Sequence, residues 1–330
     1  MLSNLVTGAT GFVGSAVARA LLARGEAVRV LVRHGSDRSN LAGLDVGAVV
    51  GDLTDAASLA RAVAGCTRVF HVAADYRIWV PDPDAMLAAN VGGTTALMLA
   101  AADAGVSRIV YCSSVAALGL TKDGTPADET TPVSEDSVVG IYKKSKFRAE
   151  QAVLNLVRTR GLPAVIVNPA APVGPRDIKP TPTGKMIADA AAGRMPAYVE
   201  TGLNIVHVDD VAAGHLLAAD RGIVGERYIL GGENLTLAQV LALVDAETGR
   251  SQRRVRLPGA ALWPLALACE GIARITGIAP LVTRDHLRMA RKLMFFSSAK
   301  ASRDLGYAPR PASAAVADAI AWFRANGRLR

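Results

Sequence analysis

The sequence predicts an α/β fold, in which a doubly wound parallel sheet with helices on both faces is followed by a smaller C-terminal α/β part. Three observations predict it. Short apolar runs alternate with Ala- and Leu-rich stretches of helical length through the first half of the chain. A glycine-rich loop joins the first run to the first helical stretch. The 330 residues are 51% hydrophobic and 20% charged, which is enough apolar material for a large buried core.

Taken in order, the apolar runs give five strands, and the stretches between them give the helices. The expected strands are residues 2–7, 28–32, 47–50, 68–72 and 107–112. The expected helices are residues 15–24, 56–64, 85–104 and 142–160. Residues 1–169 are therefore assigned to the sheet domain. Residues 170–330 are assigned mainly to a substrate-binding part that returns some segments to the sheet.

The loop after the first strand contains three regularly spaced glycines. Glycine fits there because the turn needs backbone angles that other residues resist and because a pyrophosphate must approach bare backbone. The free N–H groups and the positive dipole end of the next helix then hold the phosphates. A tight turn is the other reading of this spacing, but its place at the first strand–helix junction predicts dinucleotide binding. The residues assigned to the cofactor are Gly8, Thr10, Gly11, Phe12, Val13 and Gly14.

The end of the second strand predicts which dinucleotide binds. An acidic residue there would hydrogen-bond the ribose 2′-hydroxyl of NAD, but this chain has Arg33, with Ser36 and Arg38 nearby. A guanidinium suits a 2′-phosphate, so NADP is the first choice and NAD the second; a surface arginine without a ligand is the alternative. Asp52, after the third strand, is placed to meet the adenine end or to cap the following helix.

Tyr142 and Lys146 lie one helical turn apart, on one face of an expected helix. A phenol has an unperturbed pKa of ~10 and needs a nearby cation to ionise near neutrality. Lys146 is the expected cation, and Tyr142 would exchange a proton with a substrate hydroxyl or carbonyl. Ser114 follows the fifth strand, at the sheet edge where such folds bind ligands, and could hydrogen-bond the reacting oxygen. A polar turn or a helix cap is its other reading.

At these residues the chain resembles the extended short-chain dehydrogenase/reductase family of NAD(P)-dependent epimerases and dehydratases. The motifs are Thr7-Gly8-Ala-Thr-Gly11-Phe-Val-Gly14, Asp52-Leu53, His71-Val-Ala-Ala74, Asn90-Val-Gly-Gly-Thr94, Ser113-Ser114, Tyr142-x-x-x-Lys146 and Asn168-Pro169. The resemblance implies a Rossmann-like fold and the catalytic residues Ser114, Tyr142 and Lys146. It also implies that Tyr142 and Lys146 contact the cofactor together with Asp52, Leu53, Val72, Ala73, Ala74, Asn90, Asn168 and Pro169.

Nearly the whole chain looks like a narrower group, the hopanoid-associated sugar epimerases. The motifs lie at residues 172–184, 206–211, 228–234 and 294–300. The chain is also similar to dihydroflavonol reductases, which use NADPH. Sugar 4,6-dehydratases carry Thr-Asp-Glu where this chain has Ser114-Val-Ala116, so elimination of water is not expected. Redox-neutral epimerases usually hold NAD whereas Arg33 favours NADP, so both reactions stay open.

The net charge of +8 is concentrated at the C-terminal end. Residues 251–330 carry 14 Lys and Arg against four Asp and Glu, a net charge of +10. This excess can meet a phosphate or an anionic membrane, or form a solvated face, and the 5% aromatic content disfavours nucleic acid. Beside it, residues 257–277 could dock the small part on the sheet or meet a lipid-like substrate or a membrane. The basic residues are Arg253, Arg254, Arg256, Arg284, Arg288, Arg291 and Lys292.

Cysteine usage and the apolar segments predict the compartment. Cys66, Cys112 and Cys269 are too far apart for a C-x-x-C pair, and their odd, sparse number favours a reducing compartment. The N-terminus lacks the basic and apolar regions of a signal peptide. The apolar run at residues 257–269 is shorter than the ~20 residues that span a bilayer. A cytoplasmic protein without a transmembrane helix is expected.

Residues 170–205 are rich in Pro, Gly and Thr and are expected to form loops over a cleft. Arg176, Lys179 and Lys185 in this segment could meet a phosphate or carboxylate of the substrate, or be solvated. His207 and the two aspartates that follow at 209 and 210 match a family motif that begins a helix, so capping is expected there rather than catalysis. No metal is expected, because potential ligands do not cluster in the sequence.

The leading hypothesis is an NADP-dependent oxidoreductase or epimerase that acts on a hydroxyl or carbonyl of a sugar-like or polyol-bearing small molecule. This substrate can be lipid-linked or phosphorylated, and the resemblance suggests hopanoid lipid synthesis. One alternative is an NADPH-dependent carbonyl reductase of the dihydroflavonol-reductase type. An alternative of another class is a non-catalytic dinucleotide-sensing scaffold, which the joint presence of Ser114, Tyr142 and Lys146 disfavours. Weak peripheral membrane contact and an oligomer are both compatible with the sequence.

Overall fold

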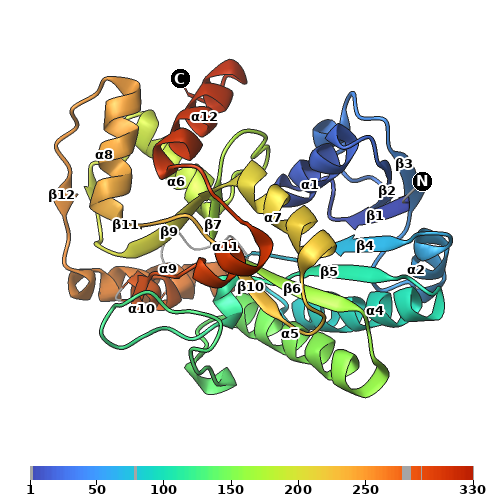
Figure 1. Ribbon diagram of the computed structural model, residues 1–330. Helices are drawn as coiled ribbons and strands as arrows, with labels where there is room; N and C mark the ends of the chain where they lie inside the picture. Colours follow the sequence, from blue (N-terminus) through green and yellow to red (C-terminus); the bar gives the residue numbers. More distant parts are fainter. Residues whose placement is uncertain (1–2, 78–79, 277–283, 291, 330) are drawn as a thin grey trace.

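The computed structural model describes residues 3–77, 80–276, 284–290 and 292–329, and it has a larger and a smaller part (Figure 1). The larger part holds a seven-stranded sheet in the order β10-β6-β5-β4-β1-β2-β3, with every pair parallel. Strand order reverses between β1 and β4, as in a doubly wound Rossmann-like sheet. The predicted fold class is confirmed. The strands are β1 (Ser3–Thr7), β2 (Ala27–Val32), β3 (Gly47–Val50), β4 (Arg68–His71), β5 (Arg108–Cys112), β6 (Ala164–Pro169) and β10 (Arg227–Leu230).

The five strands expected from the sequence are present, each within one residue of its expected bounds; Leu2 lies outside the described residues. The first helix, α1 (Phe12–Ala23), begins three residues earlier than expected. It begins there because Gly11, at the end of the glycine loop, is itself the N-cap. β6 and β10 were not among the five expected strands, and β10 joins the sheet from the C-terminal half of the chain.

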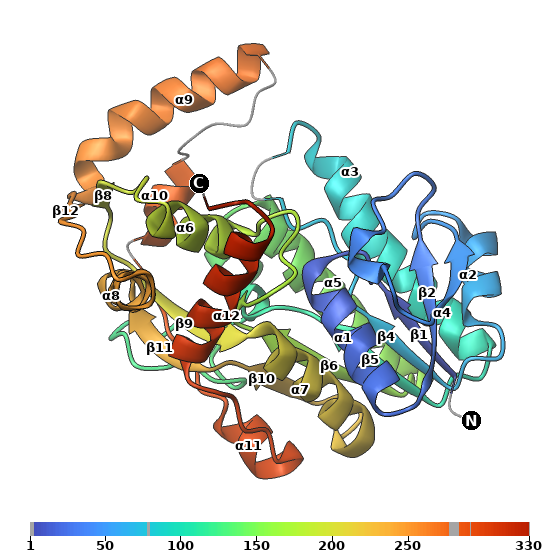
Figure 2. The ribbon, with the colours of Figure 1, turned by 90° about the horizontal axis from the view of Figure 1, so that it is seen from above.

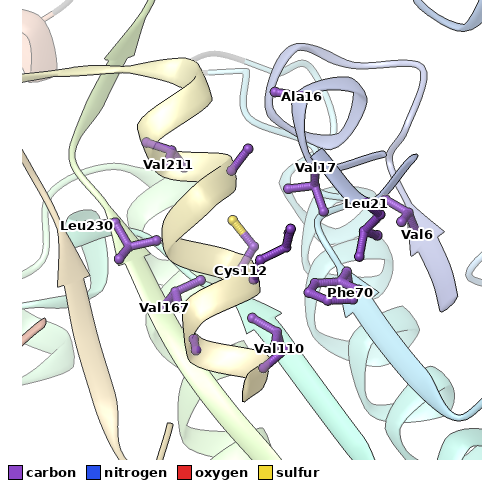
Figure 3. Close-up of a cluster of buried hydrophobic side chains, with 14 of the residues drawn as sticks. Val6, Ala16, Val17, Leu21, Phe70, Val110, Cys112, Val167, Val211 and Leu230 are labelled. Carbon is purple, nitrogen blue, oxygen red and sulfur yellow. The ribbon is translucent and has the colours of Figure 1, made fainter. Parts of the chain in front are cut away.

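One face of the large sheet is covered by α1 and α7 (Val208–Arg221), which pack against each other. The side chains that fill this face are apolar and buried. Figure 3 labels Val6, Ala16, Val17, Leu21, Phe70, Val110, Cys112, Val167, Val211 and Leu230 among them. Because α7 follows the first strands of the smaller part, this packing ties the C-terminal half of the chain to the glycine-loop helix.

The opposite face is covered by α2 (Ala56–Val63), α4 (Gly93–Asp103) and α5 (Ile141–Arg160). All six residues of β6 are buried, as expected for a parallel strand with helices on both faces. The fully buried side chains between these helices and the sheet include Leu59, Leu97, Met98, Ile109, Val153 and Ile166. Truncating one of the large ones to alanine typically costs about 2–5 kcal/mol. This packing holds α5, which carries Tyr142 and Lys146, against the sheet.

A long apolar helix precedes β5. α3 (Pro83–Leu87), the π-helical turn η2 (Ala88–Gly92) and α4 continue as one helix of 21 residues with a mean hydropathy of 1.5, enough by length and composition to cross a membrane. Its uncharged run, residues 85–102, is longer than the run at residues 257–269 from which the absence of a transmembrane helix was expected. Its place between β4 and β5, with Leu97 and Met98 fully buried, makes it a core helix of the sheet.

The prediction of loops for residues 170–205 was wrong. This segment contains β7 (Ala171–Val173), α6 (Pro182–Ala191), β8 (Ala197–Tyr198) and most of β9 (Gly202–His207). Most of the prolines and glycines that suggested loops stand between these elements or in their first turns, and Pro172 lies within β7. Pro182 occupies the first turn of α6, where a missing N–H breaks no hydrogen bond.

The smaller part is built on a mixed sheet in which β7 and β13 (Leu293–Met294) run parallel to β9, and β11 (Glu233–Thr236) runs antiparallel to it. α6, α8 (Leu237–Thr248) and α12 (Ala312–Ala325) pack together with this sheet. Its buried core includes Ile187, Ile205, Val240, Leu241, Val316, Ile320 and Phe323. The remaining elements are β12 (Val255–Arg256), α9 (Trp263–Thr276), α10 (Arg284–Ala290), α11 (Ala299–Leu305), and the short helices η1 (Ser39–Leu41), η3 (Val115–Ala117), η4 (Glu135–Ser137) and η5 (Gly259–Leu262).

Candidate active site

The carboxyl ends of the central strands lie level with one another. Thr7 of β1 pairs with Leu31 of β2 and His71 of β4, and His71 pairs with Tyr111 of β5. The loops that follow these strands therefore gather at one edge of the sheet, where doubly wound folds bind ligands. The predicted cofactor and catalytic residues in the loops after β1 to β5 all belong to this edge.

The glycine loop packs too tightly for side chains at two of its positions. Gly8 has a φ of +72°, and an added Cβ there would lie 2.7 Å from the backbone N of Ala73. An added Cβ on Gly14 would lie 2.2 Å from the carbonyl oxygen of Gly8. The Gly11 N–H donates to the same carbonyl at 2.9 Å and closes the turn. Glycine is required here by close backbone approach, as the sequence predicts.

The start of α1 is prepared for an anion. Its N-cap, Gly11, has no side chain that could accept hydrogen bonds from the first N–H groups, and no acidic residue lies in the first turn of the helix. The first N–H groups of a helix have no partner within the helix. Phe12 and Val13 are half-buried, and Thr10 contributes its carbonyl to Asn40 Nδ2 at 3.2 Å. This bare cradle of backbone fits the pyrophosphate of a dinucleotide.

A chain of hydrogen bonds fixes the loop after β4 against Gly8. Thr7 Oγ1 accepts from the Ala73 N–H at 3.1 Å and is 2.8 Å from His71 Nδ1, and His71 Nε2 is 2.9 Å from Thr94 Oγ1. The predicted cofactor residues Val72, Ala73 and Ala74 are half-buried in this loop. The structure thus places this segment directly against the glycine loop.

Asn90 holds the same loop from the other side. Its Oδ1 accepts from the Asp75 N–H at 2.7 Å, and its Nδ2 donates to the Asp75 carbonyl at 2.8 Å and to Ser145 Oγ at 2.9 Å. These partners tie the β4 loop to α5. Asn90 was predicted to contact the cofactor; the structure gives its amide protein partners, through which it positions the loop.

Arg33 follows β2 directly and is exposed. Hydrogen bonds from Thr54, with a smaller contribution from the Arg33 charge, lower the pKa of Asp52. The alternative that Asp52 caps the next helix was wrong, because Asp55 caps α2 by accepting from the Ala57 N–H. Leu53 packs on α4, where an added Cβ on Gly93 would meet it at 2.7 Å. Arg33 and Asp52 thus lie near each other beyond β2 and β3.

Ser114 lies near enough to Tyr142 to act on the pKa of its phenol. Ser114 lies two residues beyond β5 and caps η3 by accepting from the Ala116 N–H at 3.1 Å. Its hydroxyl proton therefore remains available for the phenol oxygen. Burial raises the pKa of Tyr142 to about 12, and the hydrogen bond from Ser114 opposes part of this shift. Ser114 acts as a cap and as a partner of Tyr142.

Lys146 is buried one helical turn further along α5. Its Nζ donates to the Cys112 carbonyl at 2.7 Å and lies 5.1 Å from the centre of the Tyr111 ring. Burial lowers the pKa of Lys146. The sequence assigned to Lys146 the lowering of the Tyr142 pKa, but burial dominates at Tyr142 and the opposing hydrogen bond comes from Ser114. Lys146 is anchored to the carboxyl end of β5.

A buried polar network behind Ser114 was not predicted. Asn168, at the end of β6, donates from Nδ2 to the Ser114 carbonyl at 3.0 Å and to Glu150 Oε2 at 2.8 Å. Glu150 is fully buried on α5, and Arg227 of β10 lies 3.3 Å from its other oxygen. Pro169, the last residue of β6, is buried beside Asn168. The i,i+4 spacing of Lys146 and Glu150 on α5 was the signal that could have suggested this network.

Lys143, next to Tyr142, was also not among the predicted site residues. Burial, with a smaller contribution from Lys292, lowers the pKa of Lys143 to about 8. Its Nζ lies 3.9 Å from Met294 Sδ on β13 of the smaller part. A half-desolvated ammonium beside the reactive tyrosine is a candidate for contact with a polar group of the substrate.

The cations expected at the substrate end are mostly paired within the protein. Arg176 forms an ion pair with Asp209, and Lys185 forms one with Asp189. Lys179 is exposed. Arg176 also adopts a φ of +75°, which is uncommon for a residue other than glycine. Arg176 and Lys185 therefore have carboxylate partners within the protein, although the Lys185 side chain is largely exposed.

His207 caps α7, as predicted, by accepting from the Asp209 N–H at 3.0 Å. Its Nε2 lies 3.1 Å from Asp318 on α12, and Asp210 accepts from the Arg310 N–H at 2.8 Å. These contacts join α7 to the C-terminal segment.

Two buried histidines outside the reaction predict acid sensitivity. Burial lowers the pKa of His71 to about 3 and that of His215 to about 4, against 6.5 for a free imidazole. Each stays neutral in the folded protein while the unfolded chain binds a proton below pH 6.5. Stability present above pH 6.5 is therefore lost as the pH falls, by about 2 kcal/mol per histidine between pH 7 and 5.

The contribution of His215 can be isolated with His215→Leu, which removes one titrating group from the core. Urea unfolding at pH 7 and 5 is expected to show a smaller loss in the variant, by about 2 kcal/mol. Equal losses in both proteins would contradict this account of the imidazole.

Comparison with known proteins identifies relatives along the full length of the chain. The chain is 44% identical over 332 residues to a Synechocystis protein provisionally named dihydroflavonol 4-reductase, covering 98% of this chain and 95% of the relative. It is 39% identical to sterol demethylase protein B of Methylococcus capsulatus, covering 99% and 100%. It is 32% identical to a 4-hydroxy-2-methyl-3-oxo-4-farnesyl-3,4-dihydroquinoline-1-oxide ketoreductase of Stigmatella aurantiaca, covering 94% and 92%.

Solved structures share the fold. The crystal structure of gox2253 superposes with a TM-score of 0.90 at 63% identity, covering 100% of this chain and 99% of that chain. PA4631, a nucleoside-diphosphate-sugar epimerase from Pseudomonas aeruginosa, superposes with a TM-score of 0.82 at 29% identity, with the same coverage.

The family model described as "NAD dependent epimerase/dehydratase family" matches residues 4–231. This range includes the glycine loop and Ser114, Tyr142 and Lys146, so the resemblance to extended short-chain dehydrogenases/reductases is confirmed. The chain belongs to the NAD dependent epimerase/dehydratase family and is an NAD(P)-dependent epimerase/reductase of the extended short-chain dehydrogenase/reductase type.

Proposed function

We propose that this protein is an NADP-dependent carbonyl reductase that acts in the cytoplasm on a ketone or aldehyde of a largely apolar small molecule. The observation that carries the proposal is the proximity of Ser114 and Tyr142 at the carboxyl end of β5, with Lys146 one turn further along the helix that holds Tyr142. A carbonyl oxygen that becomes a hydroxyl needs hydrogen-bond donors and then a proton. Two adjacent hydroxyl groups supply both.

The protonation state of Tyr142 favours reduction. With a pKa of about 12, the phenol keeps its proton at neutral pH. A protonated phenol can donate to an oxygen that is gaining negative charge, which a net reduction requires. The reverse reaction, and the first half of an epimerisation, would need the phenolate.

The remaining site residues bind and orient the cofactor and the substrate. When bound, a nicotinamide dinucleotide supplies the hydride for the carbonyl carbon. The glycine loop and the start of α1 hold its pyrophosphate, and Lys146 holds the nicotinamide ribose. Ser114 orients the substrate oxygen toward Tyr142. The network of Asn168 and Glu150 keeps the Ser114 backbone in place from behind.

Arg33 supports the preference for NADP, because it stands at the end of β2 where NAD-binding proteins of this fold carry an acid. Arg33→Ala is expected to weaken NADP binding by about 1.5–3 kcal/mol, roughly ten- to a hundredfold, through loss of a charge-assisted contact. Titration of both proteins with NADP and NAD measures it. NAD affinity is the internal control, because NAD lacks the phosphate. Unchanged NADP affinity would contradict the assignment.

The class of substrate is proposed from the relatives. One is named for sterol demethylation and another for reduction of a farnesylated quinoline, so both names refer to molecules with large apolar parts. The motif resemblance to the hopanoid-associated group agrees with a polycyclic isoprenoid lipid. We therefore propose a membrane-lipid precursor with a carbonyl near one polar end as the substrate.

A sugar epimerase is the second candidate. It is favoured by the likeness to the P. aeruginosa nucleoside-diphosphate-sugar epimerase, which covers the whole chain. An epimerase starts from the oxidised dinucleotide and returns it to that state, so it forms product without net change in the cofactor.

One assay distinguishes the two reactions. The purified protein is mixed with a panel of ketosteroids, alkyl ketones, aldehydes and nucleotide sugars, once with NADPH and once with NADP+, because an epimerase begins by transferring a hydride from the sugar to the oxidised cofactor. Stoichiometric oxidation of NADPH with an apolar carbonyl compound supports the reductase. Conversion of a nucleotide sugar with NADP+, without net reduction of that cofactor, favours the epimerase and contradicts the first proposal.

A further inference from the structure

The described part of the chain exposes apolar side chains mainly in one region. Nine large hydrophobic residues are exposed in total, and five of these lie between positions 255 and 293. They are Val255, Leu265, Leu267, Ile272 and Leu293. An apolar group of this kind on a folded chain commonly marks a surface that meets another body.

Three of these residues belong to α9, which has one buried and one exposed side. Ala266 and Ala273 are 0% and 2% exposed and face the protein. Leu265, Leu267 and Ile272 are 46%, 53% and 60% exposed. Ala268 and Gly271 are also exposed, so the described outward positions from 265 to 272 carry no charge. A surface helix usually buries its larger apolar residues, whereas α9 exposes them.

The only charged group of α9 that the structure describes points inward. Glu270 lies 2.8 Å from Arg284 of α10 and is mostly buried. α9 therefore rests on α10 and η5 through small residues and one ion pair. Figure 2 shows α9 along the outer margin of the smaller part, apart from the large sheet. The prediction that residues 257–277 dock the small part on the sheet was wrong for the described residues; Gly277 lies outside them.

Exposed cations flank this apolar side. Arg253 and Arg256 are exposed just before η5, and Lys292 is exposed just before β13. Arg288, more than half exposed, lies over the Trp263 ring at the start of α9, 6.0 Å from its centre. Arg254, Arg284 and Arg288 are paired with carboxylates, the last with Asp285 at 3.3 Å, and Arg291 lies outside the described residues. Part of the charge predicted from the sequence is thus neutralised, and Arg253, Arg256 and Lys292 remain as exposed cations in the segments just before η5 and β13.

We propose that α9 is a membrane-docking helix, whose exposed apolar side enters the interface of an anionic bilayer while the flanking cations contact lipid head groups. This pairing of an apolar helix face with neighbouring cations is the composition that such helices use. A second copy of the chain would bring two positive surfaces together and is therefore disfavoured. The proposal does not depend on the reaction, although a reductase for an apolar lipid would meet its substrate at this surface.

Two double variants separate the apolar and electrostatic contributions. Leu265→Ser with Ile272→Ser removes the apolar contact, and Arg253→Gln with Arg256→Gln removes two cations. Each has a matched control on the larger part: Ile223→Ser, at a site that is also 60% exposed, and Arg61→Gln with Arg158→Gln, both exposed. NADP affinity and Tm establish that every variant is folded.

Binding is measured by co-sedimentation with phosphatidylcholine vesicles that contain about a third phosphatidylglycerol, and with pure phosphatidylcholine vesicles. We expect the full chain to prefer anionic vesicles and to lose at least about tenfold in binding between ~50 mM and ~500 mM salt. Each double variant should bind anionic vesicles at least about tenfold more weakly than the parent. For Arg253→Gln with Arg256→Gln the reason is that one cation near such a surface contributes about fivefold in binding. The controls should bind like the parent.

A protein that binds neither kind of vesicle would overturn the proposal. Binding that is unchanged in both double variants would also overturn it. Light scattering gives the remaining test. A dimer that Leu265→Ser with Ile272→Ser dissociates, in a protein that does not bind vesicles, would assign the surface to a second copy instead. Failure of this experiment leaves the reductase assay unaffected, so the two proposals are tested separately.

Discussion

Tyr142→Phe is expected to lower turnover by about a hundredfold to ten-thousandfold while leaving cofactor affinity nearly unchanged. The substitution removes only the oxygen that carries the proton, and the contribution of such a group lies in this range. Ser114, Lys146 and the glycine loop keep their protein contacts. Steady-state kinetics with NADPH, together with a cofactor titration, measures the two quantities separately.

The control is Tyr307→Phe, which removes another buried phenol oxygen, far along the chain from the active site. It should keep the parental rate. Lys146→Met should weaken both turnover and cofactor binding, because Lys146 is assigned to hold the ribose. A Tyr142→Phe protein that retains more than about a tenth of the rate has lost less than ~1.4 kcal/mol. Such a result would remove Tyr142 from the role of principal acid.

Gly14→Ala is expected to weaken cofactor binding strongly. Its methyl group would lie 2.2 Å from Gly8 O, 2.5 Å from Gly8 C and 2.9 Å from Ala9 N, all of them backbone atoms. The start of α1 must then move away from the loop that holds the pyrophosphate. We expect a loss of cofactor affinity of at least about a hundredfold, or roughly 3 kcal/mol, together with a lower Tm.

Two graded controls keep this prediction testable if the Gly14 variant folds poorly. An added Cβ on Gly11 would meet only Gly8 O, at 3.2 Å, so Gly11→Ala should fold and bind with a smaller loss. Gly92 lies in a helix with nothing within 4 Å of an added Cβ, so Gly92→Ala should be neutral. Parental affinity in a folded Gly14→Ala protein would show that the loop tolerates the side chain.

The larger part could be predicted closely because its information is local. Each strand is a continuous apolar run, and each turn after a strand carries its own glycine or polar residue. α6 was missed because Pro182 and Gly184 in its first turn resemble a loop, while the side chains that hold it, such as Ile187, pack against elements far away in the sequence. β10 likewise becomes a strand of the large sheet only through its pairing with β6.

The same distinction applies to the active site. Ser114, Tyr142 and Lys146 could be found from spacing and position, since they stand at strand and helix ends. Glu150 and Asn168 could not, because their contact depends on the packing of α5 against β6. The effect of Lys146 on the Tyr142 pKa was misjudged for a related reason. Burial of the phenol decides that pKa, and burial is not visible in a four-residue spacing.

The central claim is that Tyr142 delivers a proton to a carbonyl oxygen as NADPH reduces the carbonyl carbon. Incubation with NADPH that carries deuterium at nicotinamide C4 tests it most directly, with mass spectrometry of the product formed from an apolar ketone. The account predicts one deuterium on the carbon that bears the new hydroxyl group, delivered from one face of the nicotinamide only, and at least about a hundredfold less labelled product from Tyr142→Phe in the same time. Product that carries no deuterium from either face, or equal labelling by the Tyr142→Phe protein, would contradict it.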